Sequence, residues 1–145
     1  MRVSEIVRRK GTDVVTVAPG ATVSDLVALL HDHHIGAVVV LDDDRRLIGI
    51  VGERDIVRGL AEQGPGVLHS PVSELMTTQV ETCSPGDDVP GLAERMTSLR
   101  IRHLPVTSDD DEPGVLAIVS IGDIVKSRLE ELEHERSQLE NYISQ

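Results

Sequence analysis

The chain has 145 residues, enough for one compact domain or two very small ones. It carries no Phe, no Trp and one Tyr, so its core must be aliphatic, and its formal net charge of -11 disfavours binding to duplex DNA or RNA, which depends on Lys and Arg at the phosphates. No apolar run approaches the roughly 20 residues that span a bilayer, and the N-terminus has no export signal. With one cysteine and so no internal disulfide, we expect a cytoplasmic protein without membrane or nucleic-acid partners.

The first sixty residues predict a β-α-β-β-α unit. A short strand over residues 14–17 ends at Pro19-Gly20, a turn signal. Thr22, with Asp25 three residues later, forms an approximate capping box at the start of a helix. The apolar run over residues 37–41 predicts a buried strand, followed by an aspartate-rich turn, a strand over 47–51 and a helix over 53–61.

The same unit occurs a second time along the chain. Residues 16–23 match 82–89 at an offset of 66, and residues 50–57 match 118–125 at an offset of 68. Residues 3–6 are echoed by 72–75. The second copy therefore predicts a strand over 80–83, a helix over 89–99, strands over 104–106 and 115–119, and a helix from about residue 121. We divide the chain into a first repeat (1–66), a second repeat (67–128) and a C-terminal helical extension (129–145).

The last helix is expected to continue to about residue 142 and to carry an apolar stripe. Its positions follow a 4-3-4-3-4 spacing, typical of coiled coils: Val125, Leu129, Leu132, Arg136, Leu139 and Ile143. Either the stripe packs on the protein's own surface, or it meets a partner helix. We favour the second interpretation and a homodimer, because a two-fold contact is the commonest closed symmetry.

Each repeat ends in a similar motif, Gly49-Ile50-Val51-Gly52-Glu53-Arg54-Asp55 in the first and Ala117-Ile118-Val119-Ser120-Ile121-Gly122-Asp123 in the second. Together with residues 35–40 and 101–106, these segments resemble the CBS domain, and the tandem resembles a Bateman module. The resemblance implies a mixed α/β fold in which two β-α-β-β-α repeats are related by pseudo-two-fold symmetry, with their sheets face to face. It also implies two clefts that commonly bind AMP, ADP, ATP or S-adenosylmethionine. Such modules usually regulate another protein, and here we expect action in trans on an unknown protein partner.

The second motif supplies most of what a nucleoside site needs. A carboxylate can accept hydrogen bonds from both ribose hydroxyls, and a hydroxyl at a helix start can meet phosphate with help from the helix dipole. By resemblance, these are Asp123 and Ser120, next to Gly122. The other nucleotide-binding positions carried over are His103 and Arg102 for phosphate, and Val15, Ile35 and Gly36 for the base. The plain alternative is that Asp123 and Ser120 only cap the helix.

The first motif forms a weaker second site. Its carboxylate is Asp55, but Gly52 replaces the hydroxyl residue, and Ala37 stands where the second repeat has His103. Losing one charge-assisted hydrogen bond lowers affinity by roughly ten- to a hundredfold. The remaining positions of this second site are Arg54, with Arg58 as a further cation, and Val80, Ile101 and Arg102 on the base side.

Other chemistry is weakly indicated. His31, His33 and His34 lack the i, i+4 spacing of a helical metal site, and the acidic runs at 42–44 and 109–112 have the composition of solvated turns rather than of a calcium loop. Cys83 lies on a predicted buried strand as a small hydrophobe. No phosphate-binding loop or nucleophile–base pair is found, so we expect no enzyme activity, no metal and no cofactor. Two functions remain open, a sensor of an adenosine compound and a ligand-free interaction or dimerisation module with vestigial clefts.

Overall fold

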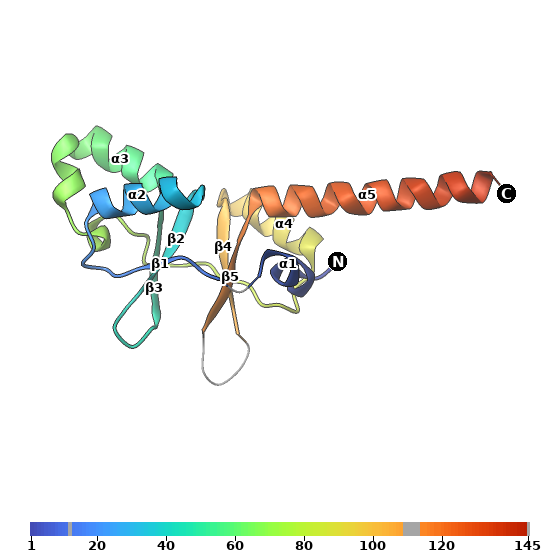
Figure 1. Ribbon diagram of the computed structural model, residues 1–145, viewed down its shortest axis with the longest axis horizontal. Helices are drawn as coiled ribbons and strands as arrows, with labels where there is room; N and C mark the ends of the chain where they lie inside the picture. The colour runs from blue at the N-terminus through green and yellow to red at the C-terminus, as the bar shows by residue number, and fades with distance from the viewer. Residues whose placement is uncertain (12, 109–113, 145) are drawn as a thin grey trace.

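The computed structural model describes residues 1–11, 13–108 and 114–144 (Figure 1). In chain order its elements are α1 (Val3–Lys10), β1 (Thr16–Val17), α2 (Val23–His33), β2 (Ala37–Leu41), β3 (Leu47–Gly52), α3 (Glu53–Gln63), η1 (Pro65–His69), η2 (Val72–Glu74), α4 (Val89–Leu99), β4 (His103–Thr107), β5 (Val115–Ser120) and α5 (Ile121–Ile143). The mixed α/β fold with two small sheets and a long C-terminal helix is the one the sequence predicts.

The two sheets differ in one strand. In the first repeat, β1 pairs parallel to β2, which pairs antiparallel to β3. Among the described residues of the second repeat, only β4 and β5 form a sheet, and the strand predicted over residues 80–83 is wrong. Cys83 alone pairs there, donating to the Pro105 carbonyl at 3.0 Å and accepting from the Thr107 amide at 2.9 Å. The next bond of a parallel ladder would need an N–H on Pro105, which proline lacks.

The capping box predicted at Thr22 sets the start of α2. The Thr22 side chain accepts from the Asp25 amide at 3.1 Å and closes the capping box of α2. The helices α2 and α4 both end on a residue in the left-handed conformation, His34 with φ 54° and Arg100 with φ 56°. These two residues occupy matching places in the repeats and turn the chain into β2 and β4.

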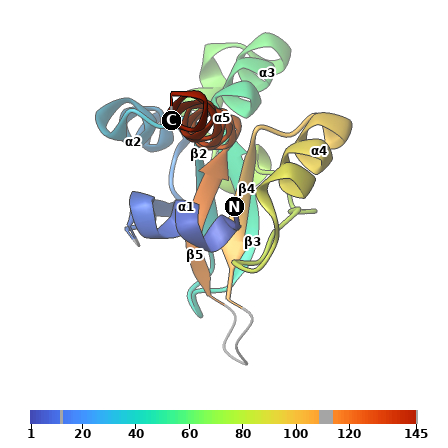
Figure 2. The same cartoon turned by 90° about the vertical axis from the view of Figure 1, so that its right-hand side faces the viewer.

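Two separate aliphatic cores hold the repeats, and the chain crosses between them. Val67, Val72 and Leu75, from the start of the second repeat as the sequence divides the chain, pack into the core of the first. Conversely, Val3 and Ile6 of α1 pack into the core of the second, with residues of α4, β4 and β5. Figure 2 shows α1 and α4 on either side of the β4–β5 hairpin. The chain after α1 therefore has to run back from the second repeat to the first.

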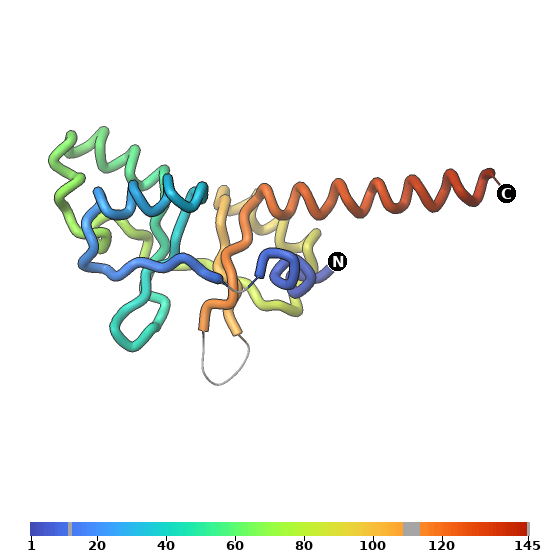
Figure 3. Tube along the Cα trace, in the orientation of Figure 1, coloured from blue at the N-terminus to red at the C-terminus, as the bar shows by residue number. Residues whose placement is uncertain are grey.

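The last helix is long and only its first part is anchored. α5 has 23 residues and buries Ile124 and Ser127 against the second repeat. The Met1 amino group lies 3.2 Å from a Glu131 carboxylate oxygen, and Arg9 pairs with Glu130, so α1 braces α5. Beyond these contacts the helix projects away from the body (Figures 1 and 3). Within the described residues, no helix combines the length and apolar content needed to cross a bilayer.

Candidate ligand-binding site

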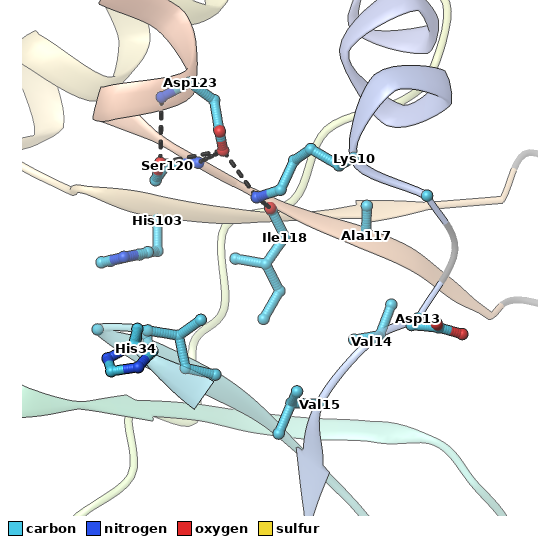
Figure 4. Close-up of a pocket in the computed structure, with 14 residues that line it drawn as sticks. Lys10, Asp13, Val14, Val15, His34, His103, Ala117, Ile118, Ser120 and Asp123 are labelled. Atoms are coloured by element: carbon cyan, nitrogen blue, oxygen red, sulfur yellow. Dashed lines mark hydrogen bonds and ion pairs between the residues drawn. The ribbon is translucent and has the colours of Figure 1, made fainter. Parts of the chain in front are cut away.

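The larger cavity of interest lies between the repeats, where the chain runs from α1 towards β1 (Figure 4). Its volume is about 350 Å³. It is lined by Lys10, Gly11, Asp13, Val14, Val15, His34, Ile35, Gly36, Ala37, His103, Ala117, Ile118, Ser120 and Asp123. The structure thus brings together six of the residues carried over from the resemblance: Asp123, Ser120, His103, Val15, Ile35 and Gly36.

Asp123 and Ser120 meet at the first turn of α5. Asp123 Oδ2 accepts from the Ser120 amide at 2.8 Å and from Ser120 Oγ at 3.0 Å, and Ser120 Oγ accepts from the Asp123 amide at 3.1 Å. This is a complete capping box, so the structural role of the pair is real. All hydrogen bonds of this carboxylate within the described residues fall on Oδ2. Oδ1 is therefore available as an acceptor for a ligand.

Lys10, at the end of α1, is a cavity residue that the sequence did not reveal. Its Nζ lies 2.8 Å from Asp123 Oδ2 and 2.6 Å from the Ile118 carbonyl oxygen (Figure 4). Burial alone would raise the pKa of Asp123, but hydrogen bonds from Lys10 and Ser120 and the Lys10 charge outweigh it, so this pKa lies below its ordinary value. A ligand that uses Asp123 must share the carboxylate with Lys10 or displace it. The basic run at residues 8–10 was the only signal, because no helix was predicted there.

His103 packs on the backbone of Gly36. A Cβ added at Gly36 would lie 3.3 Å from both Cε1 and Nε2 of the imidazole ring, so the absent side chain makes room for the histidine. Burial, followed by the positive charges of Arg102 and Lys10, lowers the pKa of His103, against the opposing effect of Glu53 and Asp123. At neutral pH His103 is therefore an uncharged donor or acceptor rather than a cation. The basic phosphate contact that the resemblance implies at this position is therefore not a cation here.

Two carried-over residues do not line this cavity. Gly122 faces no part of it, and its position inside α5 places it near the cap residue, with an added Cβ 3.5 Å from Ser120 Oγ. The carbonyl of Arg102 accepts from the Ile121 amide at 2.9 Å, and the residue lines the second cavity instead. Three further residues, Val14, Ala117 and Ile118, add apolar surface to the cavity. Ile118 points across it towards Val15 and His34 (Figure 4).

The second cavity has a volume of about 240 Å³ and adjoins the first. It is lined by Gly36, Ala37, Ile50, Val51, Gly52, Glu53, Arg54, Asp55, Arg58, Arg100, Ile101, Arg102 and His103. Asp55, Arg54, Ile101 and Arg102 are brought together as expected, whereas Val80 does not line this cavity. Gly36, Ala37 and His103 line both cavities, so they form the wall between them.

The second cavity is cationic although the protein as a whole is acidic. Among the described residues, four arginines line it against two carboxylates, Glu53 and Asp55; the arginines are Arg54, Arg58, Arg100 and Arg102. Asp55 is already engaged, since its Oδ1 lies 2.8 Å from Arg58 and its Oδ2 accepts from the Gly52 amide at 2.9 Å. A pocket sets its own local field, so the charge of -11 on the whole chain does not exclude anion binding here.

Gly52 is glycine for a steric reason. A Cβ at this position would lie 2.5 Å from the Gly36 carbonyl oxygen and 3.1 Å from the Ala37 Cβ. The same carbonyl accepts from the Glu53 amide at 3.0 Å and so is fixed in place. A serine matching Ser120 does not fit without a backbone shift. The missing hydroxyl in the first repeat therefore goes with a backbone contact to Gly36 that leaves no room for a Cβ.

The other candidate residues have structural surroundings. Among residues 1–11, 13–108 and 114–144, no three His, Cys, Asp or Glu side chains gather as metal ligands would, and His31 and His34 are 6.4 Å apart by ring centroid. Asp42 Oδ1 accepts from the Asp44 and Arg46 amides, which makes the first acidic run a turn; the second, at 109–112, lies outside the described residues. Burial first, and then Asp87, raise the pKa of Cys83 to about 11, which suits a core thiol.

Comparison with known proteins decides the family. The family model described as "CBS domain" matches twice, over residues 3–62 and 72–130. The chain belongs to the CBS-domain family. A crystal structure of a CBS-domain containing protein from Agrobacterium tumefaciens is 42% identical, with a TM-score of 0.82, and the match covers 88% of this chain and 92% of that one. Tandem CBS pairs are thus its structural neighbours.

Two further solved CBS structures hold ligands. The CBS domain pair of protein MJ0100, in complex with 5'-methylthioadenosine and S-adenosyl-L-methionine, is 26% identical with a TM-score of 0.77, covering 92% of this chain and 98% of that one. A CBS domain protein from Pyrobaculum aerophilum, complexed with AMP, is 26% identical with a TM-score of 0.73, covering 85% and 89%. Stand-alone CBS pairs are generally regulatory proteins rather than catalysts.

Proposed function

We propose that this CBS pair binds an adenosine-containing ligand, of the AMP, ADP, ATP or S-adenosylmethionine class, in the cavity beneath Asp123, and that binding regulates a partner protein in trans. The observation that carries the proposal is the cavity itself. It joins a carboxylate with a free oxygen, at the first turn of a helix, to apolar walls supplied by both repeats. The ligands held by the two related CBS structures support the same class.

Each part of an adenosine ligand finds suitable groups in this cavity. Asp123 Oδ1 is placed to accept from ribose hydroxyls at the start of α5. Val15, Ile35 and Ile118 offer apolar surface to a base. Lys10, released from the carboxylate, would be the nearest cation for a phosphate, and an anion there would also favour protonation of His103. The site thus changes its charge state when it is filled.

The second cavity is proposed as an anion-preferring site of the same ligand class. It lacks the hydroxyl at Gly52 and the apolar contact expected from Val80, which weakens it for the nucleoside portion. Its four arginines favour a ligand with several phosphates over a neutral one. We expect the nucleoside to prefer the Asp123 cavity and the charge of a nucleotide to decide whether the second cavity fills.

Regulation requires that the ligand prefers one of two arrangements of the protein. Lys10 provides the connection, because it belongs to α1, and α1 is also joined to α5 through Arg9–Glu130 and the Met1 amine–Glu131 pair. A ligand that displaces Lys10 from Asp123 therefore acts on the helix that braces α5. The cytoplasmic setting and the absence of enzyme activity stay predictions from the sequence.

Calorimetric titration with AMP and with S-adenosylmethionine tests the proposal. Asp123→Asn keeps an oxygen for the cap but removes the charge, and Asp55→Asn is the matched control at the same place in the first repeat. We expect Asp123→Asn to weaken the tighter binding event by roughly ten- to a hundredfold. Asp55→Asn should leave that event unchanged.

The opposite results have clear meanings. No heat with AMP, ADP, ATP or S-adenosylmethionine, in protein free of co-purified nucleotide, would contradict the ligand proposal and favour the interaction module with vestigial clefts. Equal affinities of the wild type and Asp123→Asn would show that a ligand binds elsewhere.

A further inference from the structure

One face of α5 is apolar and uncovered. Val125, Leu129, Leu132, Leu139 and Ile143 are between 47% and 81% exposed, so the stripe does not pack on the protein's own surface. Residues 132–143 project beyond the body (Figures 1 and 3), and the CBS match ends at residue 130. The family fold therefore does not account for this part of the helix. Contiguous exposed apolar residues of this kind mark an interaction surface.

We propose that α5 pairs with α5 of a second copy of this chain, in an antiparallel helical pair. The register places Leu132 beside the partner's Arg136, Leu129 beside the partner's Leu139, and Val125 beside the partner's Ile143. Because the two-fold axis repeats every contact, both ends of the seam are then wholly apolar. Only the two central layers contain Arg136. This inference does not depend on the proposed ligand.

The charges that flank both ends of the seam are complementary in this arrangement. Two rows of positions flank the seam, and in an antiparallel pair each row lies against the same row of the partner. Lys126 therefore lies near the partner's Glu140 at both ends. Arg128 likewise lies near the partner's Tyr142, which is 80% exposed, with an aromatic face for a cation. Near the axis Glu133 and Glu135 each meet their own copy, which makes two like-charge contacts, but Arg136 of each chain lies close to them. Arg136 already pairs with glutamates of its own helix, which it would also do at the seam.

A parallel pair fits this sequence less well. In a parallel pair, identical core positions face each other, so Arg136 would lie against the partner's Arg136 in the middle of the seam. Glu135 would also lie near the partner's Glu140, a second like-charge contact. Among the flanking contacts, only Arg128 and the partner's Glu133 would attract each other. The single charged residue in the stripe therefore selects the antiparallel direction.

The shape of the molecule leaves room for the pair. The contacts of α1 with α5 reach Glu131, and the stripe lies on a different side of the helix from buried Ile124 and Ser127. A shallow, mostly apolar groove continues the stripe along α5, lined in part by Ile121, Val125 and Leu129. In the antiparallel register the partner's body lies beside residues 137–143, beyond the end of this chain's own body (Figure 1).

Disulfide trapping tests both the pair and its direction. Leu129→Cys and Leu139→Cys are made as separate variants of the full chain, and native Cys83 stays in place because it is buried. When the two variants are mixed and oxidised, we expect a cross-linked dimer containing one chain of each. Either variant alone should give little cross-link. Cross-linking of each variant with itself would overturn the proposal in favour of a parallel pair.

The charge pairs give an independent test by analytical ultracentrifugation. We expect a wild-type dimer at tens of micromolar protein, several-fold weaker association for Lys126→Glu or Glu140→Lys, and recovery in the double variant. Leu129→Glu should be monomeric. Glu62→Lys, on the exposed side of α3, is the control for an unrelated charge change. A monomeric wild type, or a dimer that Leu129→Glu leaves intact, would overturn the proposal.

Discussion

Replacing Gly52 by serine restores the hydroxyl that the first motif lacks, yet we expect it to destabilise the protein. The φ of Gly52 is −154°, which any residue adopts, so the difficulty is contact rather than backbone strain. The added Cβ would lie 2.5 Å from the Gly36 carbonyl oxygen, closer than real Cβ atoms come to other atoms. That oxygen is held by the Glu53 amide at 3.0 Å and cannot move alone. Either β2 and β3 separate locally, or the hydrogen bond at the start of α3 is lost.

The cost can be estimated from overpacking in other cores, which lowers the free energy of unfolding by about 1–3 kcal/mol. For a chain of this size, that corresponds to a fall in Tm of roughly 3–10 °C. Thermal unfolding followed by circular dichroism measures it, with Gly20→Ala as control, since a Cβ at Gly20 meets nothing within 4 Å. A Gly52→Ser protein as stable as wild type would refute this account of the glycine.

Three further predictions concern titratable groups. The pKa of His103 is below 6.5 in the folded protein, so the unfolded chain binds the extra proton as the pH falls through about 6.5, and the free energy of unfolding falls with it. Urea unfolding of His103→Gln should therefore show a shallower decline in the free energy of unfolding between about pH 8 and pH 5.5. Equal slopes for the variant and the wild type would contradict this. Because the pKa of Asp123 is lowered, its contribution is present above about pH 4 and lost as the pH falls through the folded-state value, so Asp123→Asn should cost about 1 kcal/mol at neutral pH and nothing in strong acid. Cys83, with a pKa of about 11, should react with a thiol reagent at pH 8 far more slowly in the native protein than in urea, and equal rates would mean that the core opens readily.

The internal repeat made most of the fold predictable. Each unit carries its own turn and capping signals, with Pro-Gly turns and capping residues at matching positions. The helices and strands predicted in one copy therefore support those predicted in the other. The exceptions have local or long-range causes. The strand expected over residues 80–83 is reduced to Cys83, because Pro105 on the neighbouring strand β4 has no N–H for the next hydrogen bond. The sequence contains this point, but the match between the repeats concealed it.

The site was predictable in its second-repeat half and less so elsewhere. Asp123, Ser120 and the residues on the first repeat were found because a family motif fixes their places. Lys10 was missed because it lies 113 residues from Asp123 and reaches it only after α1 docks on the other repeat. The neutral state of His103 and the tight contact at Gly52 depend on burial and on backbone proximity between strands. Neither can be read from residue types alone.

A crystal structure of the protein with AMP tests the central claim most directly. The account predicts adenosine in the cavity between the repeats, with ribose hydroxyls on the Asp123 carboxylate, the base against Val15 and Ile35, and Lys10 moved away from Asp123 Oδ2. An empty cavity at saturating AMP, or AMP bound elsewhere with the Lys10–Asp123 pair intact, would contradict it.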